Sequence, residues 1–197
     1  MQPEIEKLPN LTLKGQNKLN KRFIEFGCVD FHSACNWLWK LPYQTNETSD
    51  VNSVFVEGCG TCTTKHGVAA TLAEELGLQI HKYLVFYRLD DSIIRGAGDV
   101  MERCNVPFIP GRHCVLGFEG FFTDLTWGNQ TGKLIDLVDF ELYVRVPPFP
   151  SHQESEDLYA WALSWYQKDE PKLKNLSIED AISIRKECFQ LQIKCAC

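Results

Sequence analysis

Cys62 stands where a thiol could act as a nucleophile. It follows the closely spaced glycines Gly58 and Gly60 and opens a segment in which apolar residues recur at helical spacing as far as Leu76. At 100° per residue Cys62 falls within the apolar stripe, so we expect it in the first helical turn, facing the body of the protein. Unpaired N–H groups and the positive end of the helix dipole stabilise a thiolate there, and the thiolate is the reactive form of cysteine. The alternative is a small buried cysteine at a helix start.

A nucleophilic thiol needs a base that takes its proton and a third group that orients the base. The sequence offers His113 and Asp124, which flank Glu119-Gly120, interpreted as a two-residue hairpin turn. With that turn, paired residues have numbers that sum to 239, so His113 and Asp124 are diagonal neighbours on one sheet face. A register slip of one residue would send the acid to the other face. We therefore predict Cys62, His113 and Asp124 as nucleophile, base and orienting acid.

The other histidines are less suited to the role of base. His66 lies four residues after Cys62 and about 40° from it around the helix axis. A base on the nucleophile's own helix points the same way as the thiol without converging on its proton, so we rank His66 below the hairpin histidine. His32 and His152 have no nucleophile nearby and are interpreted as surface residues. His81 starts a strand and could face either way.

Two further groups leave alternatives open. Asp136 and Asp139 rival Asp124 as the acid, but they lie beyond a turn-rich stretch and cannot be placed on the same sheet face. Lys65 projects into the apolar stripe of the Cys62 helix. We expect it to snorkel at the helix start, with its charge in solvent. The alternative is that its charge lowers the pKa of the thiol.

Composition and charge narrow the class of protein. The 197 residues are 44% hydrophobic and 23% charged, which is enough for a core, so we predict a single domain over 1–197. A net charge of -6 without a block of Lys or Arg argues against nucleic acid as a partner. The N-terminus lacks a secretory signal and no apolar run is as long as a membrane span, so we expect a cytoplasmic protein without membrane association. The nine cysteines are then not expected to form a disulfide framework.

The order of the expected elements favours an α+β fold. Helical spacing of apolar residues predicts helices over 16–26, 30–41, 62–76 and 154–193. Asp30 is the expected N-cap of the second helix, and Gly77 the C-cap of the third. Runs of β-branched and aromatic residues predict strands over 54–56, 83–89, 113–118, 121–127 and 141–146. Because helices, strands and helices follow one another in blocks, we expect an antiparallel sheet rather than βαβ units.

Several motifs together resemble a known family. A Gly-Thr-Cys sequence at 60–62 opens a helix, a helix with two tryptophans ends before it at Pro42, and His113 precedes an Asp-Leu-Thr sequence at 124–126. In their order and spacing, these motifs resemble the transglutaminase-like branch of the papain-like cysteine enzymes. The resemblance implies a papain-like or transglutaminase-like α+β fold, in which the cysteine helix packs on an antiparallel sheet. The core would span about 30–147, with extra helices at both ends of the chain.

The resemblance also implies an activity. Cys62, His113 and Asp124 match the family's catalytic residues, which transfer acyl groups from amide bonds of peptides or proteins, glutamine amides included. No Ca²⁺-site pattern is evident, and we expect no cofactor or metal. Peptidase, amidase or deamidase, and transglutaminase activities are all compatible with the motifs, and the sequence does not select the substrate or the oligomeric state. The interval from His to Asp is shorter than is usual in the family. The side chain that completes the oxyanion hole has three candidates: Trp37, Trp39 and Gln44.

Three rival interpretations stand beside this one. Cys59 and Cys62 form a C-x-x-C ahead of a helix, which resembles thioredoxin-like thiol-disulfide oxidoreductases, although about 58 residues would then be an unexplained N-terminal extension. A structural zinc site built from these two cysteines with Cys195 and Cys197 has poor ligand spacing in its C-x-C half. The third rival is a catalytically inactive binding module with the same fold.

Overall fold

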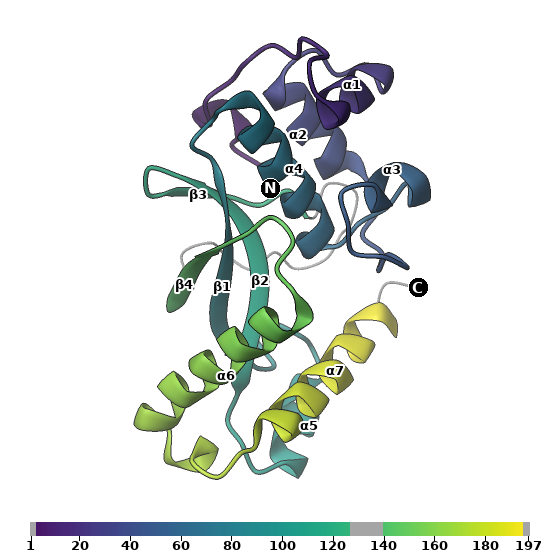
Figure 1. Ribbon diagram of the computed structural model, residues 1–197. Coiled ribbons are helices and arrows are strands. Elements are labelled where there is room, and N and C mark those ends of the chain that lie inside the picture. Colours follow the sequence, from purple (N-terminus) through teal and green to yellow (C-terminus); the bar gives the residue numbers. More distant parts are fainter. Residues whose placement is uncertain (1–2, 127–139, 195–197) are drawn as a thin grey trace. The chain divides into compact units, whose positions relative to one another are not determined.

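The structure is a computed structural model that describes residues 3–126 and 140–194 (Figure 1). The α-helices are α1 (Lys18–Glu25), α2 (Phe31–Lys40), α3 (Ser53–Glu57), α4 (Cys62–Leu76), α5 (Ala97–Arg103), α6 (His152–Asp169) and α7 (Ile178–Lys194). The strands are β1 (His81–Leu89), β2 (Ile109–Phe118), β3 (Phe121–Thr123) and β4 (Leu142–Val146). The described residues also include the short 3₁₀ helices η1 (Ile5–Lys7) and η3 (Pro171–Leu173).

Over the described residues the fold is α+β, with seven α-helices and a four-stranded antiparallel sheet in the order β3-β2-β1-β4. The predicted class and the antiparallel sheet are therefore confirmed. The finer papain-like or transglutaminase-like fold stays a prediction. None of the described helices is long and apolar enough to cross a membrane.

The described chain falls into two compact units. The first contains residues 3–84, 113–126 and 144–150, and the second contains 85–112, 140–143 and 151–194. All residues of the candidate site belong to the first unit. The predicted single domain over 1–197 stays a prediction.

Local signals in the sequence explain where the helices of the first unit begin and end. Asp30 caps α2 as predicted: its carboxylate accepts the N–H of Ser33 at 2.7 Å, and the Ser33 hydroxyl accepts the N–H of Asp30 at 2.9 Å. Gly77 ends α4 in the left-handed conformation, with φ of 72°, which glycine adopts without steric cost.

One predicted element is wrong. The run 54–56 is not a strand but lies within the helix α3. The Ser53 hydroxyl accepts the N–H of Asp50 at 3.0 Å and donates to the carbonyl of Thr48 at 2.8 Å, and these bonds turn the chain at the helix start. Three consecutive apolar residues are too few to distinguish the helical period from the strand period.

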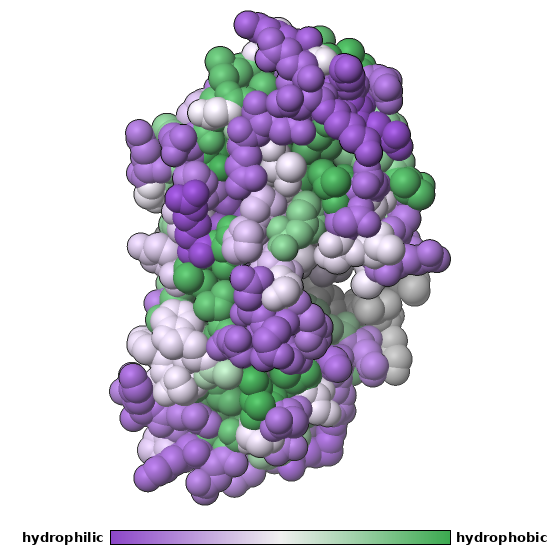
Figure 2. Space-filling model, viewed as in Figure 1, coloured by the Kyte–Doolittle hydropathy of each residue, from purple (hydrophilic) through white to green (hydrophobic). Residues whose placement is uncertain are grey.

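The core of the first unit lies where α1 and α2 pack against α4. Side chains from all three helices are fully buried there, among them Phe23, Phe31, Leu38 and Leu72. The sheet side of the same cluster includes Leu116 and Leu125. The outer surface over α1, at the top of Figure 2, is mostly hydrophilic. Burial of the apolar stripes, at about 25 cal/mol per Å² of apolar surface, fixes α4 in place.

The first two turns of α4 are buried on more than one side. The sequence pattern places Thr64 and Gly67 on the polar side of the helix, yet both are buried. A Cβ atom added at Gly67 would lie 2.6 Å from the carbonyl oxygen of Pro148 and 2.8 Å from the ring of Phe149. The chain after β4 therefore covers the side of α4 that the pattern assigns to solvent.

The hairpin of β2 and β3 has the predicted register, but β3 ends at Thr123, so the predicted strand over 121–127 is too long and Asp124 directly follows the strand. Phe118 pairs with Phe121 and Leu116 with Thr123, so the numbers of paired residues sum to 239. The turn residues Glu119 and Gly120 have φ of 48° and 83°, and both are positive, as a type I′ turn requires. The strand β2 starts at Ile109, earlier than the predicted start at 113.

In the second unit, α7 contacts α5 and α6. On α6, Tyr159, Ala162 and Tyr166 are buried, whereas Trp161 is 43% exposed. Within this unit, the ring of Phe108 packs edge-on against the ring of Tyr166, with 5.4 Å between the ring centroids.

Candidate active site

Cys62 is the first residue of α4 and is half-buried. The loop before it is held by side chains: the Thr64 hydroxyl accepts the N–H of Thr61 at 2.9 Å and donates to Oδ1 of Asn46 at 2.8 Å. The Asn46 amide in turn donates to the carbonyl of Cys59 at 3.1 Å. The backbone N–H of Cys62 belongs to the first helical turn, whose donors have no partner inside the helix. The local sequence therefore places a sulfur and a backbone donor together at a positive helix end.

His113 and Asp124 meet beside the hairpin. Nε2 of His113 lies 2.8 Å from Oδ2 of Asp124, and the other carboxylate oxygen accepts the N–H of Thr126 at 2.8 Å. Burial by itself would lower the pKa of His113, but the charge and hydrogen bond of Asp124 raise it above its ordinary value. Burial would raise the pKa of Asp124, and His113 instead holds it well below its usual range. Asp124 is therefore ionised, Nε2 carries a proton, and the lone pair of the neutral imidazole is at Nδ1.

His66 ties the helix to the acid-bearing segment. Its Nδ1 donates to the carbonyl of Cys62 at 2.7 Å, and its Nε2 accepts the N–H of Leu125 at 2.8 Å. Burial lowers the pKa of His66 to about 3, so the ring is neutral. Although Oδ1 of Asp124 is only 3.4 Å from Nε2, that nitrogen accepts a hydrogen bond and carries no proton, so the two do not form an ion pair. His66 is a positioning residue, and its ring lies edge-on to His113 at 6.2 Å between centroids.

The sulfur of Cys62 has a neighbour that the sequence analysis missed. The thiol and the backbone N–H of Cys114 both donate hydrogen bonds to it. The sulfur of Cys114 also lies 3.8 Å from the Thr63 hydroxyl, in the first turn of α4. These bonds lower the pKa of Cys62 below that of an ordinary thiol, against the effect of burial, and raise the pKa of Cys114 well above it. Cys62 is therefore the thiolate of the pair. The sequence feature that could have indicated this contact is that Cys114 directly follows His113, the candidate base.

The prediction that Lys65 snorkels, with its charge in solvent, is wrong. Its side chain is fully buried, and Nζ donates to the carbonyls of Leu41 at 2.6 Å and Thr126 at 2.9 Å. Burial lowers its pKa to about 8. These two backbone carbonyls replace the water that a surface ammonium would bind. Lys65 therefore connects α4 to the end of α2 and to the segment after β3.

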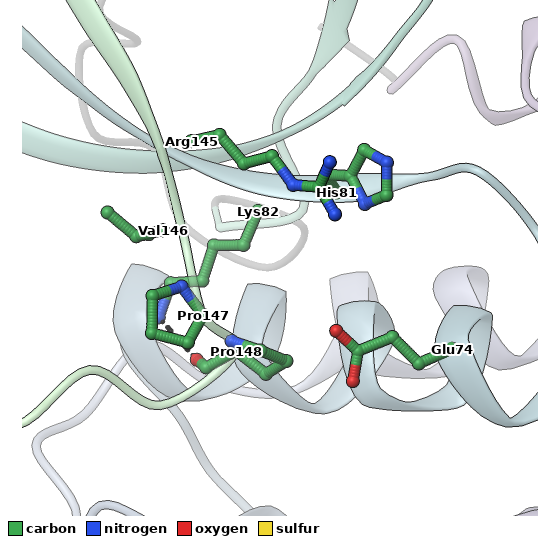
Figure 3. Close-up of a pocket in the computed structure, with 7 residues that line it drawn as sticks. All are labelled: Glu74, His81, Lys82, Arg145, Val146, Pro147 and Pro148. Carbon is green, nitrogen blue, oxygen red and sulfur yellow. Dashed lines mark hydrogen bonds between the residues drawn. The ribbon is translucent and has the colours of Figure 1, made fainter.

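Lys82 on β1 is a second buried lysine, and the sequence analysis did not select it. It is 1% exposed, and its Nζ donates to the carbonyls of Thr63 at 3.0 Å and Pro148 at 2.8 Å. Figure 3 shows this side chain extending from its strand toward the residues after β4. Its charge lowers the pKa of Cys62, although less than the hydrogen bonds from Cys114 do. The available signal was a lysine directly before the apolar run 83–87 of β1.

A pocket with a cavity volume of about 310 Å³ lies beside Lys82 (Figure 3). Its lining residues are Glu74, His81, Lys82, Arg145, Val146, Pro147 and Pro148. Burial lowers the pKa of His81, and the charge of Arg145 lowers it further. The three predicted catalytic residues do not line this pocket, so it shares only Lys82 with the surroundings of the candidate site.

The side chains considered for the oxyanion hole occupy different places. Trp37 stacks on Phe55 at 5.2 Å between centroids and meets Phe23 edge-on at 5.8 Å, within the aromatic core. Trp39 lines a second cavity of about 350 Å³ beside the N-terminal segment. Gln44 is exposed. None of the three is placed beside Cys62 by a described hydrogen bond, whereas the backbone N–H of Cys62 lies in the first turn of α4 next to its own sulfur.

The residues behind the rival interpretations are only partly described. Asp136, Asp139, Cys195 and Cys197 lie outside the described residues. Cys59 is a buried free thiol, and burial together with the charge of Glu57 raises its pKa. Within 3–126 and 140–194, no group of three or more His, Cys, Asp or Glu side chains is arranged to hold a metal ion.

Comparisons with known proteins do not assign a family. No protein-family model matches the chain, and neither the curated proteins nor the solved structures provide a significant match. The functional argument therefore rests on the residues and their geometry.

Proposed function

We propose that the chain is a cysteine-dependent acyl-transfer enzyme that acts on amide bonds of peptides or proteins, glutamine side-chain amides included. Cys62 is the nucleophile, His113 the base and Asp124 the orienting acid. The observation that carries the proposal is the 2.8 Å contact of the His113 Nε2 atom with the Asp124 carboxylate, next to the helix start that holds a lowered-pKa thiol. Perturbed pKa values that cluster around one cysteine are typical of sites that do chemistry.

Two shared neighbours support the pairing of Cys62 with His113. His66 is hydrogen-bonded to the carbonyl of Cys62 and packs edge-on against His113. Cys114, which follows His113 directly on β2, donates hydrogen bonds to the sulfur of Cys62. Among the described residues, no hydrogen-bond partner occupies Nδ1 of His113. That nitrogen is therefore available to accept the thiol proton.

The reaction proceeds through a covalent intermediate. His113 accepts the proton of Cys62 at Nδ1, and the thiolate attacks the amide carbonyl. The backbone N–H of Cys62 stabilises the oxyanion, and His113 returns the proton to the departing ammonia or amine. Water or a second amine then cleaves the thioester and frees the thiol. The choice between water and an amine separates hydrolysis from crosslinking.

Alkylation rates measured against pH test the assignment of the nucleophile. We expect wild type and Cys59→Ala to show one rapidly alkylated thiol with a pKa below that of ordinary cysteine. Cys62→Ala should lose that thiol, and His113→Ala should shift its pKa upward. A fast thiol that disappears in Cys59→Ala and persists in Cys62→Ala would contradict the proposal and favour the C-x-x-C interpretation.

A direct test of acyl transfer uses a blocked glutamine peptide with hydroxylamine as the acceptor. We expect hydroxamate formation together with ammonia release, and an acyl adduct on the peptide that contains Cys62 when the reaction is quenched in acid. Ammonia release without hydroxamate would indicate hydrolysis instead. Rapid alkylation of Cys62 without any adduct or product, over a panel of amide peptides, would favour the inactive binding module.

A further inference from the structure

The first unit brings a second thiol to the candidate nucleophile. Cys62 starts α4 and Cys114 lies within β2, so the pair is far apart in sequence and joined only by the fold. The thiol of Cys114 donates a hydrogen bond to the sulfur of Cys62, and its sulfur is also 3.8 Å from the Thr63 hydroxyl. Because Thr63 directly follows Cys62, this 3.8 Å contact places the sulfur of Cys114 at the same helical turn as Cys62, and closeness of the two residues is what a disulfide requires.

We propose that Cys62 and Cys114 form a site of reversible oxidation, at which a hydroperoxide converts the two thiols into an intramolecular disulfide. The proposal goes beyond the acyl-transfer function, because it requires only a reactive Cys62 and the contact with Cys114. It concerns a pair different from the C-x-x-C of the sequence.

The chemistry balances with hydrogen peroxide as the oxidant. The Cys62 thiolate attacks one peroxide oxygen, the O–O bond breaks, and the products are a Cys62 sulfenic acid and hydroxide, which takes up a proton to become water. The Cys114 thiol then attacks the sulfur of Cys62, the S–O bond breaks, and a second water leaves as the disulfide forms. The pair loses two electrons in all. An external dithiol reverses the change by thiol-disulfide exchange.

The environments of the two sulfurs assign their roles. Cys62 is half-buried and is the thiolate of the pair, so a small oxidant reaches and reacts with it first. Cys114 is 3% exposed and keeps its proton until Cys62 has been oxidised. Cys114 is therefore the resolving thiol.

Cys59 is less suited to that role than its spacing suggests. Its sulfur is buried beside the Asn46 amide, 3.8 Å from Nδ2, and its backbone carbonyl is held by the same amide. The hydrogen bonds at the sulfur of Cys62 come from Cys114. The sequence motif and the fold therefore point to different disulfide partners.

A disulfide at this position would switch off acyl transfer, because the nucleophilic sulfur would be bonded to Cys114. Reduction would restore it. The pair would also keep Cys62 from oxidation beyond the sulfenic acid, since the resolving thiol consumes that species.

Peptide mapping of the full-length reduced protein after treatment with one equivalent of hydrogen peroxide tests the proposal without any substrate. We expect a crosslinked peptide pair containing Cys62 and Cys114, the loss of two thiols per chain, and full reversal by dithiothreitol. In Cys114→Ser the loss should fall to one thiol, with a sulfenic acid at Cys62 that dimedone traps. Cys114→Ala is the second variant, in case a hydroxyl at this buried position prevents folding.

Cys59→Ser is the matched control, because it removes the other cysteine near Cys62 and should leave the Cys62–Cys114 crosslink unchanged. A Cys59–Cys62 disulfide in wild type, or a thiol loss that neither Cys114 variant alters, would overturn the proposal. Because the readout is the crosslink, it is independent of acyl transfer. A chain that forms the disulfide and has no amide activity would contradict only the proposed function.

Discussion

At the scale of single residues, the candidate site consists of buried polar groups whose protonation states depend on one another. Asp124 raises the pKa of His113, and Cys114 keeps its own proton while the pKa of Cys62 is lowered. His66 is held neutral by burial. Each of these groups has a defined hydrogen-bond partner, as buried polar groups must have if the fold is to tolerate them.

The first residue-scale prediction concerns Asp124→Asn. The amide fills the same space without the negative charge, so the pKa of His113 should fall and the proton on the imidazole should be less firmly held at Nε2. We expect amide turnover to drop by about 10²–10⁴-fold, the usual contribution of a positioned acid-base group. NMR titration of His113, with kcat/KM, measures both effects. Glu119→Gln, an exposed acid on the same hairpin, is the control, and an unchanged His113 pKa in Asp124→Asn would refute the role of the acid.

The second residue-scale prediction concerns Lys82→Met. Removal of this buried ammonium should raise the pKa of Cys62 and move its alkylation profile to higher pH. It should also cost about 1–3 kcal/mol of stability, because two carbonyls lose their donor. Lys82→Arg should retain most of the pKa effect, and Lys40→Met, at an exposed lysine, should change neither quantity. A loss of stability with an unmoved alkylation profile would show that Lys82 has a structural role alone.

At the scale of elements, the junction between α4 and its neighbours positions the site. The helix start is held by Thr64 and Asn46, one side is covered by the segment after β4, and His66 reaches the segment after β3. The hairpin brings His113 to Asp124 because its type I′ turn sets the register. Residues far from the chemistry therefore control its geometry.

The element-scale prediction concerns Gly67→Ala. Helix propensity alone predicts that alanine stabilises α4 by about 1 kcal/mol. The added Cβ would instead lie 2.6 Å from the Pro148 carbonyl oxygen, so the covering segment must move. We expect a net loss of about 1–3 kcal/mol in the free energy of unfolding, measured with urea. Glu74→Ala, at an exposed position of the same helix, should change stability by less than about 0.5 kcal/mol, and a stabilised Gly67→Ala would mean that the segment does not pack there.

At the scale of the whole molecule, buried histidines link stability to pH with opposite signs. His66 has a folded pKa lowered from 6.5 to about 3, so its contribution is present above pH 6.5 and is lost as the pH falls toward 3. His113 has a raised folded pKa, so its contribution is present below its ordinary pKa and is lost as the pH rises through the folded value. The lowered pKa of Asp124 adds a further loss only in strong acid.

The whole-molecule prediction follows from His66. Between pH 6.5 and 3, only the unfolded state protonates this residue, so stability should fall by about 1.4 kcal/mol per pH unit. Urea unfolding at pH 7, 6 and 5 measures the slope. His66→Gln, which keeps hydrogen-bonding groups but does not titrate, should be less stable at pH 7 and should show a shallower slope. Equal slopes for the two proteins would indicate that another group titrates.

The sequence alone was sufficient for the features that depend on neighbouring residues. Helical spacing located α1, α2 and α4, Asp30 and Gly77 marked helix ends, and the Glu119-Gly120 turn predicted the register that brings His113 to Asp124. These features are local because caps, periods and tight turns are satisfied within a few residues.

Tertiary structure decided the features that depend on distant segments. The burial of Lys65 and Lys82 and the contact of Cys114 with Cys62 each involve partners brought close only by folding. The position of a lysine in the sequence does not show that backbone carbonyls from remote segments will replace the water around its ammonium group. The spacing of cysteines in the sequence likewise does not show which thiol will lie next to the sulfur of Cys62. The identity of the candidate nucleophile was therefore readable from the chain, whereas the groups that set its charge were determined by packing.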